Sequence, residues 1–146
     1  MTTSYETDVV AWANEQAGLL RAGRFDLLDI ENIAEEIEDV GWAEQRELMK
    51  RMSALLAHLL RWQYQPECRS KSWRLIAEVR RKLFIRALTE MPSQRSQLAD
   101  REWWKSVWND ALIQAIAETD LAVFPETCPW TFAEIMDDNW LPEEES

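Results

Sequence analysis

Residues 48–66, LMKRMSALLAHLLRWQYQP, contain the pattern that decides the fold of this chain. Apolar side chains recur three and four positions apart in this stretch, which is the period of one face of an α-helix. These side chains are Leu48, Met52, Leu55, Leu56, Leu59 and Trp62. Pro66 ends the pattern, because proline lacks the amide hydrogen that a helix interior needs. The stretch therefore predicts a helix that ends just before Pro66.

The other long segments have the same helical period, and none of them alternates cleanly as a β-strand does. A first helix should begin with a capping box formed by Thr3 and Glu6 and stop at Gly23. A second apolar stripe begins at Ile30, and Gly41 interrupts it as either a turn or a bend. The remaining expected helices are one from an N-cap at Ser72 to residue 91, one over about 98–119, and a short one capped by Thr131 and Glu134.

Each expected helix has an apolar stripe that should face the core. In the first helix it runs from Tyr5 through Trp12 to Leu20. In the second it consists of Ile30, Ile33, Ile37 and Val40, and in the helix after Ser72 it consists of Ile76, Val79, Leu83 and Ala87. In the helix over 98–119 it consists of Trp104, Val107, Trp108, Ala111, Ala115 and Ile116.

The C-terminal segment combines large apolar side chains with prolines. Pro125, Pro129 and Pro142 prevent a continuous helix. The apolar members, Phe124, Trp130, Phe132, Trp140 and Leu141, are too many for a free tail, so the segment should lie across the helices as an extended strap. We therefore expect an all-α, single-domain, antiparallel bundle of about five helices over residues 1–146, with a Trp-rich C-terminal strap and frayed ends at 1–4 and 143–146.

The composition limits the cellular setting. An apolar fraction of 47% with nine Trp excludes a disordered chain. The N-terminus has no basic and apolar signal region, and no stretch has the ~20 apolar residues of a membrane span. We expect a cytoplasmic protein that makes no membrane contact, with Cys68 and Cys128 as free thiols.

Charge is sorted into three blocks along the chain. Residues 1–45 hold eleven Asp and Glu against two Arg, residues 46–86 hold three Glu against eleven Lys and Arg, and residues 87–146 hold thirteen acids against three bases. Like charges repel, so the basic block is expected to lie between the two acidic ones in a compact fold.

Within the first acidic block, Asp29, Asn32 and Glu36 line the edge of the isoleucine stripe, where they need hydrogen-bond partners. Arg80 falls inside the apolar arc of its own helix. An unpaired inward guanidinium is costly, so Arg80 predicts a carboxylate partner, with Glu36 and Asp29 as candidates. The alternative is that the long side chain of Arg80 reaches water.

The chain has no glycine-rich phosphate loop, no C-x-x-C and no histidine-based metal motif. His58 is the only histidine, and it lies at the boundary of the apolar face of its helix. It is either a packed histidine that bonds to a carbonyl or carboxylate, or an acid, base or ligand beside Glu36. We expect no cofactor and no metal, because a lone histidine rarely suffices for a metal site.

Bases and aromatics interleave around the loop at residues 61–74, as Arg61, Trp62, Arg69, Lys71, Trp73 and Arg74. Such a set can hold phosphates and stack bases. The net charge of −11 opposes this, so internal neutralisation of the basic block is favoured over nucleic-acid binding.

Several segments resemble the bacterial family catalogued as domain of unknown function 29. They are YETD at 5–8 with Trp12, DIENIAEEIE at 29–38 followed by Gly41, HLLRWQ at 58–63, SW at 72–73 and PETCPW at 125–130. The resemblance covers nearly the whole chain and implies a small bacterial helical protein. Cys68 stands where the family is expected to have a charged residue, which argues against a general thiol role. No catalytic residue carries over.

These observations favour a non-enzymatic protein that binds a macromolecule, as an adaptor or as an antitoxin- or immunity-type protein. The expected partner is a protein with a basic surface, since opposite charge speeds association. The sequence leaves the oligomeric state open, a homodimer included. The alternatives are a hydrolytic or metal-assisted enzyme with a His58/Glu36 site, and nucleic-acid binding through residues 61–74. The candidate binding residues are Asp29, Asn32, Glu36, His58, Arg61, Trp62, Trp73, Arg74 and Arg80.

Overall fold

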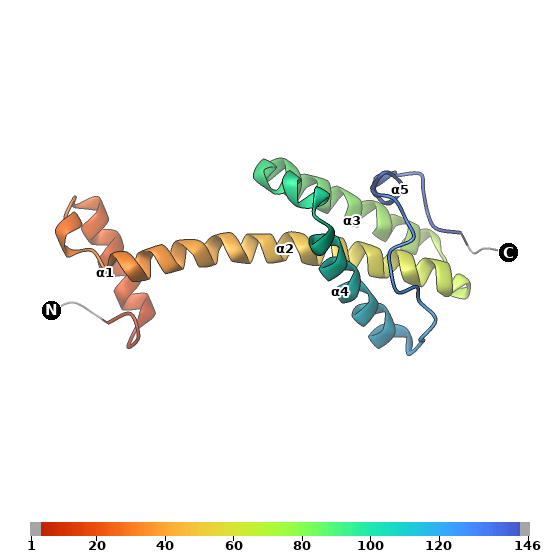
Figure 1. Cartoon of the computed structure of the whole chain (residues 1–146), viewed down its shortest axis with the longest axis horizontal. Coiled ribbons are helices and arrows are strands. Elements are labelled where there is room, and N and C mark those ends of the chain that lie inside the picture. The colour runs from red at the N-terminus through yellow and green to blue at the C-terminus, as the bar shows by residue number, and fades with distance from the viewer. Residues whose placement is uncertain (1–3, 144–146) are drawn as a thin grey trace. The chain divides into compact units, whose positions relative to one another are not determined.

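The computed structural model describes residues 4–143 and confirms the all-α class, because these residues form helices and no strand (Figure 1). The ends that were expected to fray lie outside the described residues, except for Ser4 and Glu143, which are exposed. The α-helices are α1 (Val9–Arg21), α2 (Ile30–Tyr64), α3 (Lys71–Glu90), α4 (Arg101–Thr119) and α5 (Phe132–Met136). Three 3₁₀ segments join them: η1 (Phe25–Leu27), η2 (Pro66–Cys68) and η3 (Pro92–Ala99).

The chain divides into two compact units, residues 1–44 and residues 45–146. The first unit contains α1, η1 and the beginning of α2. The second contains the rest of α2 and every later element. The first unit holds eleven of the acidic residues and two arginines, so its boundary almost coincides with that of the first charge block.

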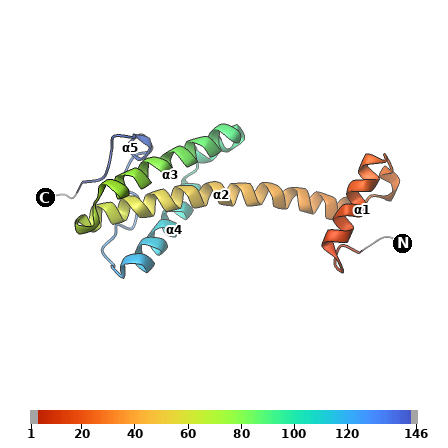
Figure 2. The ribbon, with the colours of Figure 1, turned by 180° about the vertical axis from the view of Figure 1, so that it is seen from behind.

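The core of the second unit lies around the C-terminal half of α2, with α3 and α4 along it (Figures 1 and 2). The stripe predicted from residues 48–62 is confirmed, since all six of its members are buried. Ser53 also contributes, because its hydroxyl oxygen lies within hydrogen-bond distance of the carbonyl oxygens of Met49 in α2 and Val107 in α4, at 2.9 and 3.2 Å. From α4, Trp103, Val107, Trp108, Ala111 and Ala115 enter this core. The predicted α4 stripe is therefore shifted slightly, with Ile116 exposed and Trp103 buried.

The helical period of α3 was predicted correctly, but its buried face was not. Ile76, Val79 and Leu83 are exposed. The face that packs on the core instead carries Ala77, Arg81, Phe84, Ala87 and Leu88. Ala87 is the member of the predicted stripe that is buried.

The long helix α2 continues through Gly41 without a turn. A single glycine in a helix interior costs only about 1 kcal/mol relative to alanine, which this 35-residue helix accommodates. The predicted burial of the stripe before Gly41 is wrong, because Ile30, Ile37 and Val40 are about two-thirds exposed, at 65%, 66% and 65%.

Local sequence chemistry explains most helix ends. The side chain of Asp8 caps α1, and Gly23 ends that segment with a positive φ of 73°, which glycine adopts without strain. The cap of α3 is Ser70, two residues before the predicted Ser72. Thr131 and Glu134 form the predicted capping box of α5. The capping box expected at Thr3 lies outside the described residues.

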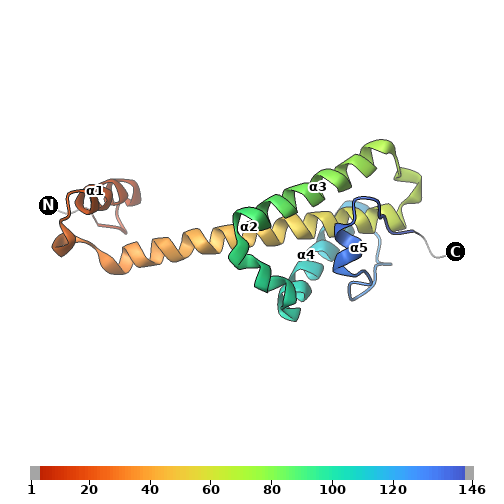
Figure 3. The ribbon, with the colours of Figure 1, turned by 90° about the horizontal axis from the view of Figure 1, so that it is seen from above.

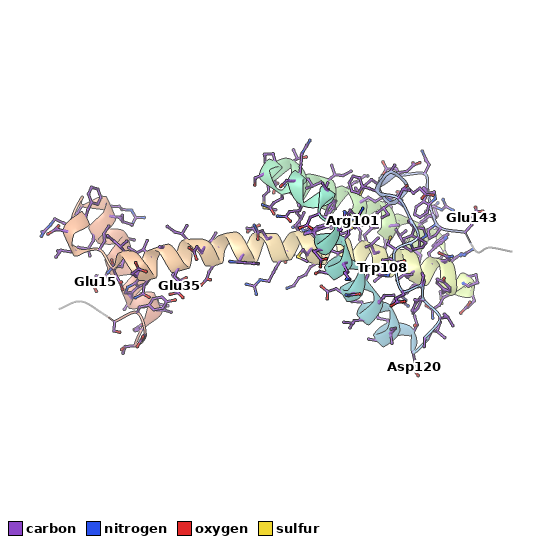
Figure 4. The ribbon with its side chains drawn as sticks, viewed as in Figure 1. Glu15, Glu35, Arg101, Trp108, Asp120 and Glu143 are labelled. Carbon is purple, nitrogen blue, oxygen red and sulfur yellow. The ribbon has the colours of Figure 1, made fainter. Side chains whose placement is uncertain are left out.

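The C-terminal strap is extended, as predicted, and packs on the second unit (Figure 3). Trp108, labelled in Figure 4, donates its indole hydrogen to the carbonyl of Pro125 at 3.2 Å. The ring of Trp130 makes edge contacts with Trp108 and Trp140, at centroid distances of 5.6 and 5.8 Å. These contacts tie the strap to α4.

Candidate functional site

Asp29 is the centre of a polar cluster in the first unit. Its Oδ2 atom accepts hydrogen bonds from the indole nitrogen of Trp12 at 2.9 Å and from the amide of Asn32 at 2.7 Å. The backbone nitrogen of Asp29 donates to the side chain of Gln16 at 2.8 Å. The bonds from Asn32 and Trp12 stabilise the ionised carboxylate and lower the pKa of Asp29. This cluster joins α1 to the start of α2.

Glu36 belongs to a second contact between the same elements. The phenol of Tyr5 donates a hydrogen bond to Glu36, and the ring of Tyr5 packs edge-on against Trp12 at a centroid distance of 4.8 Å. The hydrogen bond to Glu36 raises the pKa of Tyr5 to about 12, because loss of the phenol proton would leave two negative charges in contact.

A surface cavity of about 440 Å³ lies beside these two contacts. Its lining consists of Ser4, Tyr5, Glu6, Gln16, Leu27, Asp29 and Asn32. The sequence-predicted residues Asp29 and Asn32 therefore meet in one cavity of the first unit. Sequence reasoning did not connect them with Tyr5 and Gln16, although Tyr5, Trp12 and Gln16 recur on one helical stripe that could have suggested it.

His58 is buried in the second unit, where its Nε2 atom lies 2.7 Å from the carbonyl oxygen of Trp73. A carbonyl oxygen only accepts, so Nε2 carries the hydrogen in this bond. Burial lowers the pKa of His58, and the nearby cations Arg80 and Arg61 lower it further, against the opposing effect of the carbonyl. His58 thus links α2 to α3 through its bond to Trp73, and its lowered pKa favours the neutral ring.

The aromatic rings of the 61–74 region are covered by arginines of the same region. The guanidinium of Arg61 lies 4.8 Å from the ring centre of Trp73. Arg69 and Arg74 lie 5.4 and 5.6 Å from the ring centre of Trp62. Such cation–π contacts stabilise the loop and occupy the faces on which a nucleobase would stack.

Two of these arginines also have polar partners within the second unit. Arg61 forms an ion pair with Glu118 at 2.9 Å. Arg69 donates to the carbonyls of Trp62 and Gln63 at 2.7 and 3.3 Å. Their donors therefore satisfy protein groups and hold the end of α2 against its neighbours.

Arg80 and Arg81 have exchanged the roles that the sequence suggested. Arg81 is the buried residue, 1% exposed, and it donates to the carbonyls of Ile135 and Trp140, both at 2.6 Å. Arg80 is half-buried and its Nε atom has no partner among the described residues. Among the described residues of the second unit, no carboxylate forms an ion pair with Arg80.

Arg80 lines a groove of about 240 Å³ between α2 and α3. The other lining residues are Glu47, Lys50, Arg51, Ala54 and Leu83. The side chain of Arg51 in α2 donates a hydrogen bond to the carbonyl of Leu83 in α3 at 3.1 Å. Three bases and one acid make this groove a candidate site for a carboxylate.

The structure gives Glu36 and His58 separate partners, each within its own unit. Glu36 bonds to Tyr5, and His58 bonds to Trp73. Within residues 4–143, no group of three or more His, Cys, Asp or Glu side chains is arranged to hold a metal ion. In the same range, no helix combines the length and apolarity that crossing a membrane requires.

Comparison with known proteins identifies the family. The family described as "Domain of unknown function DUF29" matches residues 4–141, so the chain belongs to it, as its sequence motifs indicated. An α-helical protein of unknown function from Rhodospirillum rubrum ATCC 11170, with a crystal structure at 1.45 Å resolution, is similar in fold. The TM-score is 0.56 at 23% sequence identity, covering 96% of this chain and 93% of that chain. No curated protein matches the chain.

Proposed function

We propose that this chain is a non-enzymatic binding protein of the bacterial cytoplasm, acting as an adaptor or as an antitoxin- or immunity-type protein. Its partner is a protein with a basic surface. The observation that carries the proposal is the concentration of eleven acids and two arginines in one compact unit, residues 1–44. A field of one sign speeds the encounter with a partner of opposite sign, by about 10- to 1,000-fold.

The surface of the first unit supports this proposal. Glu31, Glu35 and Glu38 are exposed on α2, so their charges face solvent (Figure 4 labels Glu35). Exposed apolar side chains, among them Val10 and Phe25, accompany them in the same unit. Acidic surface with interspersed apolar side chains can combine electrostatic attraction with burial of apolar area in a complex.

The engagement of His58 and Glu36 supports a binding role over an enzymatic one. An acid–base pair needs two groups within hydrogen-bond reach of one substrate. The two side chains instead bond to Trp73 and Tyr5.

The proposal is tested by capturing partners from the native cell lysate and eluting them with salt. Each identified partner is then titrated against purified chain, with association rates measured over a series of salt concentrations. A variant with three exposed acids of the first unit neutralised should associate at least about tenfold more slowly. It carries Glu31→Gln, Glu35→Gln and Glu38→Gln.

A matched control removes the same charge from exposed acids of the second unit. It carries Glu67→Gln, Asp110→Asn and Glu126→Gln, and it should keep the association rate of the parent chain. The proposed role of the first unit would be contradicted if the two triple variants lowered the association rate equally. It would also be contradicted if the association rate did not depend on salt concentration.

A further inference from the structure

Two helical faces of this chain carry apolar side chains that the described residues leave uncovered. The first is the α2 stripe, consisting of Ile30, Ile33, Ile37 and Val40, most of which is exposed. At 100° per residue, Asp29 and Glu36 border this stripe on one side, where they accept hydrogen bonds from Trp12 and Tyr5, and Glu38 lies farther from the stripe on the other side. The α2 stripe is therefore an apolar strip with acidic residues beside it.

The second face lies on α3 and consists of Leu75, Ile76, Val79 and Leu83, which are 38–57% exposed. The same helical geometry places Arg80 along one edge of this α3 stripe and Lys82 along the other. Arg86 falls within the arc of the stripe and is ion-paired with Glu90 at 3.1 Å. The α3 stripe has basic edges, which matches the excess of Lys and Arg in that helix.

Arg80, at the edge of the α3 stripe, has a hydrogen-bond donor without an acceptor. Its Nε atom is buried and has no partner among the described residues. The groove that Arg80 lines also contains Lys50 and Arg51. A buried donor without an acceptor costs free energy, and a carboxylate at this point would remove that cost.

We infer that this chain self-associates, with the α2 stripe of one copy packed on the α3 stripe of a second copy. The acidic residues beside the α2 stripe of one copy then meet the basic edges of the α3 stripe of the other, and a carboxylate next to the α2 stripe reaches the guanidinium of Arg80. A contact between two α2 stripes would bring carboxylates together, and a contact between two α3 stripes would bring arginines and lysines together. Like charges disfavour both of those arrangements, whereas the mixed contact neutralises both edges.

A mixed contact joins different surfaces of the two copies, so a two-fold symmetric dimer contains it twice. Each copy then contributes its α2 stripe to one contact and its α3 stripe to the other. This inference goes beyond the proposed function, because it concerns the purified chain alone and involves no other protein.

The test is the mass of the purified chain by sedimentation and light scattering over a range of concentrations and salt. The parent chain should dimerise, and salt should weaken the dimer. Ile37→Asp and Val79→Asp should each raise the dissociation constant at least about 100-fold, since each places a carboxylate in both contacts. Ile113→Asp is the matched control, because Ile113 is a 65% exposed residue of α4 outside both stripes, and it should leave the dimer unchanged. Helical circular dichroism spectra verify that all three variants fold.

A mixing experiment separates the inferred contact from the alternatives. The Ile37→Asp variant keeps its α3 stripe and the Val79→Asp variant keeps its α2 stripe, so the two should form a mixed dimer through the one intact contact. A parent chain that remains monomeric overturns the inference. Loss of the dimer in only one of the two variants also overturns the inference, because it would indicate contact between two identical stripes. Failure of the two variants to associate when mixed overturns it as well.

Discussion

The indole nitrogen of Trp12 donates to the Oδ2 atom of Asp29 over 2.9 Å. Trp12 is buried in α1, and Asp29 directly precedes α2, so one hydrogen bond links the two helical segments of the first unit. A carboxylate at this end of α2 is also favoured by the helix dipole. The sequence placed Asp29 at the edge of a buried surface that requires partners, and Trp12 is one of those partners.

Replacing Trp12 by Phe keeps a large ring and removes the donor to Asp29. We expect faster amide hydrogen exchange in α1 and at the start of α2, because Asp29 loses one of its stabilising bonds. Trp42→Phe is the matched control, since Trp42 is exposed on α2, and it should leave exchange unchanged. The lowered pKa of Asp29 adds a pH dependence. Its contribution to stability is present above the ordinary pKa of 3.8 and is lost as the pH falls through the lowered value. Equal exchange rates in parent and Trp12→Phe chains would contradict this role.

The phenol of Tyr5 should lose its proton at a higher pH than an ordinary tyrosine does. Its pKa is raised to about 12 by the hydrogen bond to Glu36, and Glu36→Gln should move it down toward the ordinary 10.0. The ultraviolet absorbance of phenolate measures this, and a Tyr5→Phe chain identifies the step that belongs to Tyr5. The contact contributes fully below pH 10 and is lost as the pH rises toward 12. An unshifted Tyr5 step in the Glu36→Gln chain would argue against the contact.

His58 can be followed alone by proton NMR, because it is the only histidine. Burial holds its pKa below the ordinary 6.5, so the folded chain should titrate below that value and the urea-unfolded chain near it. The unfolded state then takes up the proton first, and the free energy of unfolding falls as the pH drops below 6.5. Arg80→Met should raise the pKa of His58, because it removes a nearby positive charge. A folded-state midpoint at or above 6.5 would favour an exposed histidine and reopen the enzymatic alternative.

Arg81 and Arg80 form a natural pair for mutagenesis. Arg81→Met leaves the carbonyls of Ile135 and Trp140 without their donors, so it should lower the free energy of unfolding by about 2–4 kcal/mol. Arg80→Met removes no hydrogen bond of the described chain and should have little effect in dilute solution, where self-association is absent. Urea unfolding followed by Trp fluorescence compares the two. An unchanged free energy of unfolding in the Arg81→Met chain would show that the strap does not depend on Arg81.

The helices could be predicted from the sequence because their apolar spacing is local. The buried face of α3 could not be predicted from the sequence, because that helix has apolar residues on two sides. The sequence analysis chose the side with Ile76 and Val79, whereas the buried side contains Arg81. The charge of Arg81 is tolerated in the core because carbonyls 54 and 59 residues away receive its donors. No local pattern reports a contact at that separation.

The candidate site was predicted in part for the same reason. Asp29, Asn32 and Glu36 share one side of a helix, so their common location follows from spacing alone. Their partners Tyr5 and Trp12 lie on another segment, and identifying them requires the packing of α1 against α2.

The last prediction concerns nucleic acid. The 61–74 region has the composition of a single-strand binding loop, but Arg61 pairs with Glu118 and Arg69 donates to two backbone carbonyls. Arginines also cover Trp62 and Trp73, so bases would have to displace them before stacking. With a net charge of −11 opposing approach, single- or double-stranded nucleic acid should bind no better than ~10⁻⁴ M at physiological salt. Fluorescence anisotropy with labelled oligonucleotides measures the affinity, with Glu118→Gln as a variant that releases Arg61 from its ion pair. Micromolar binding by the parent chain, weakening steeply with salt, would replace the protein partner proposed here with a nucleic acid.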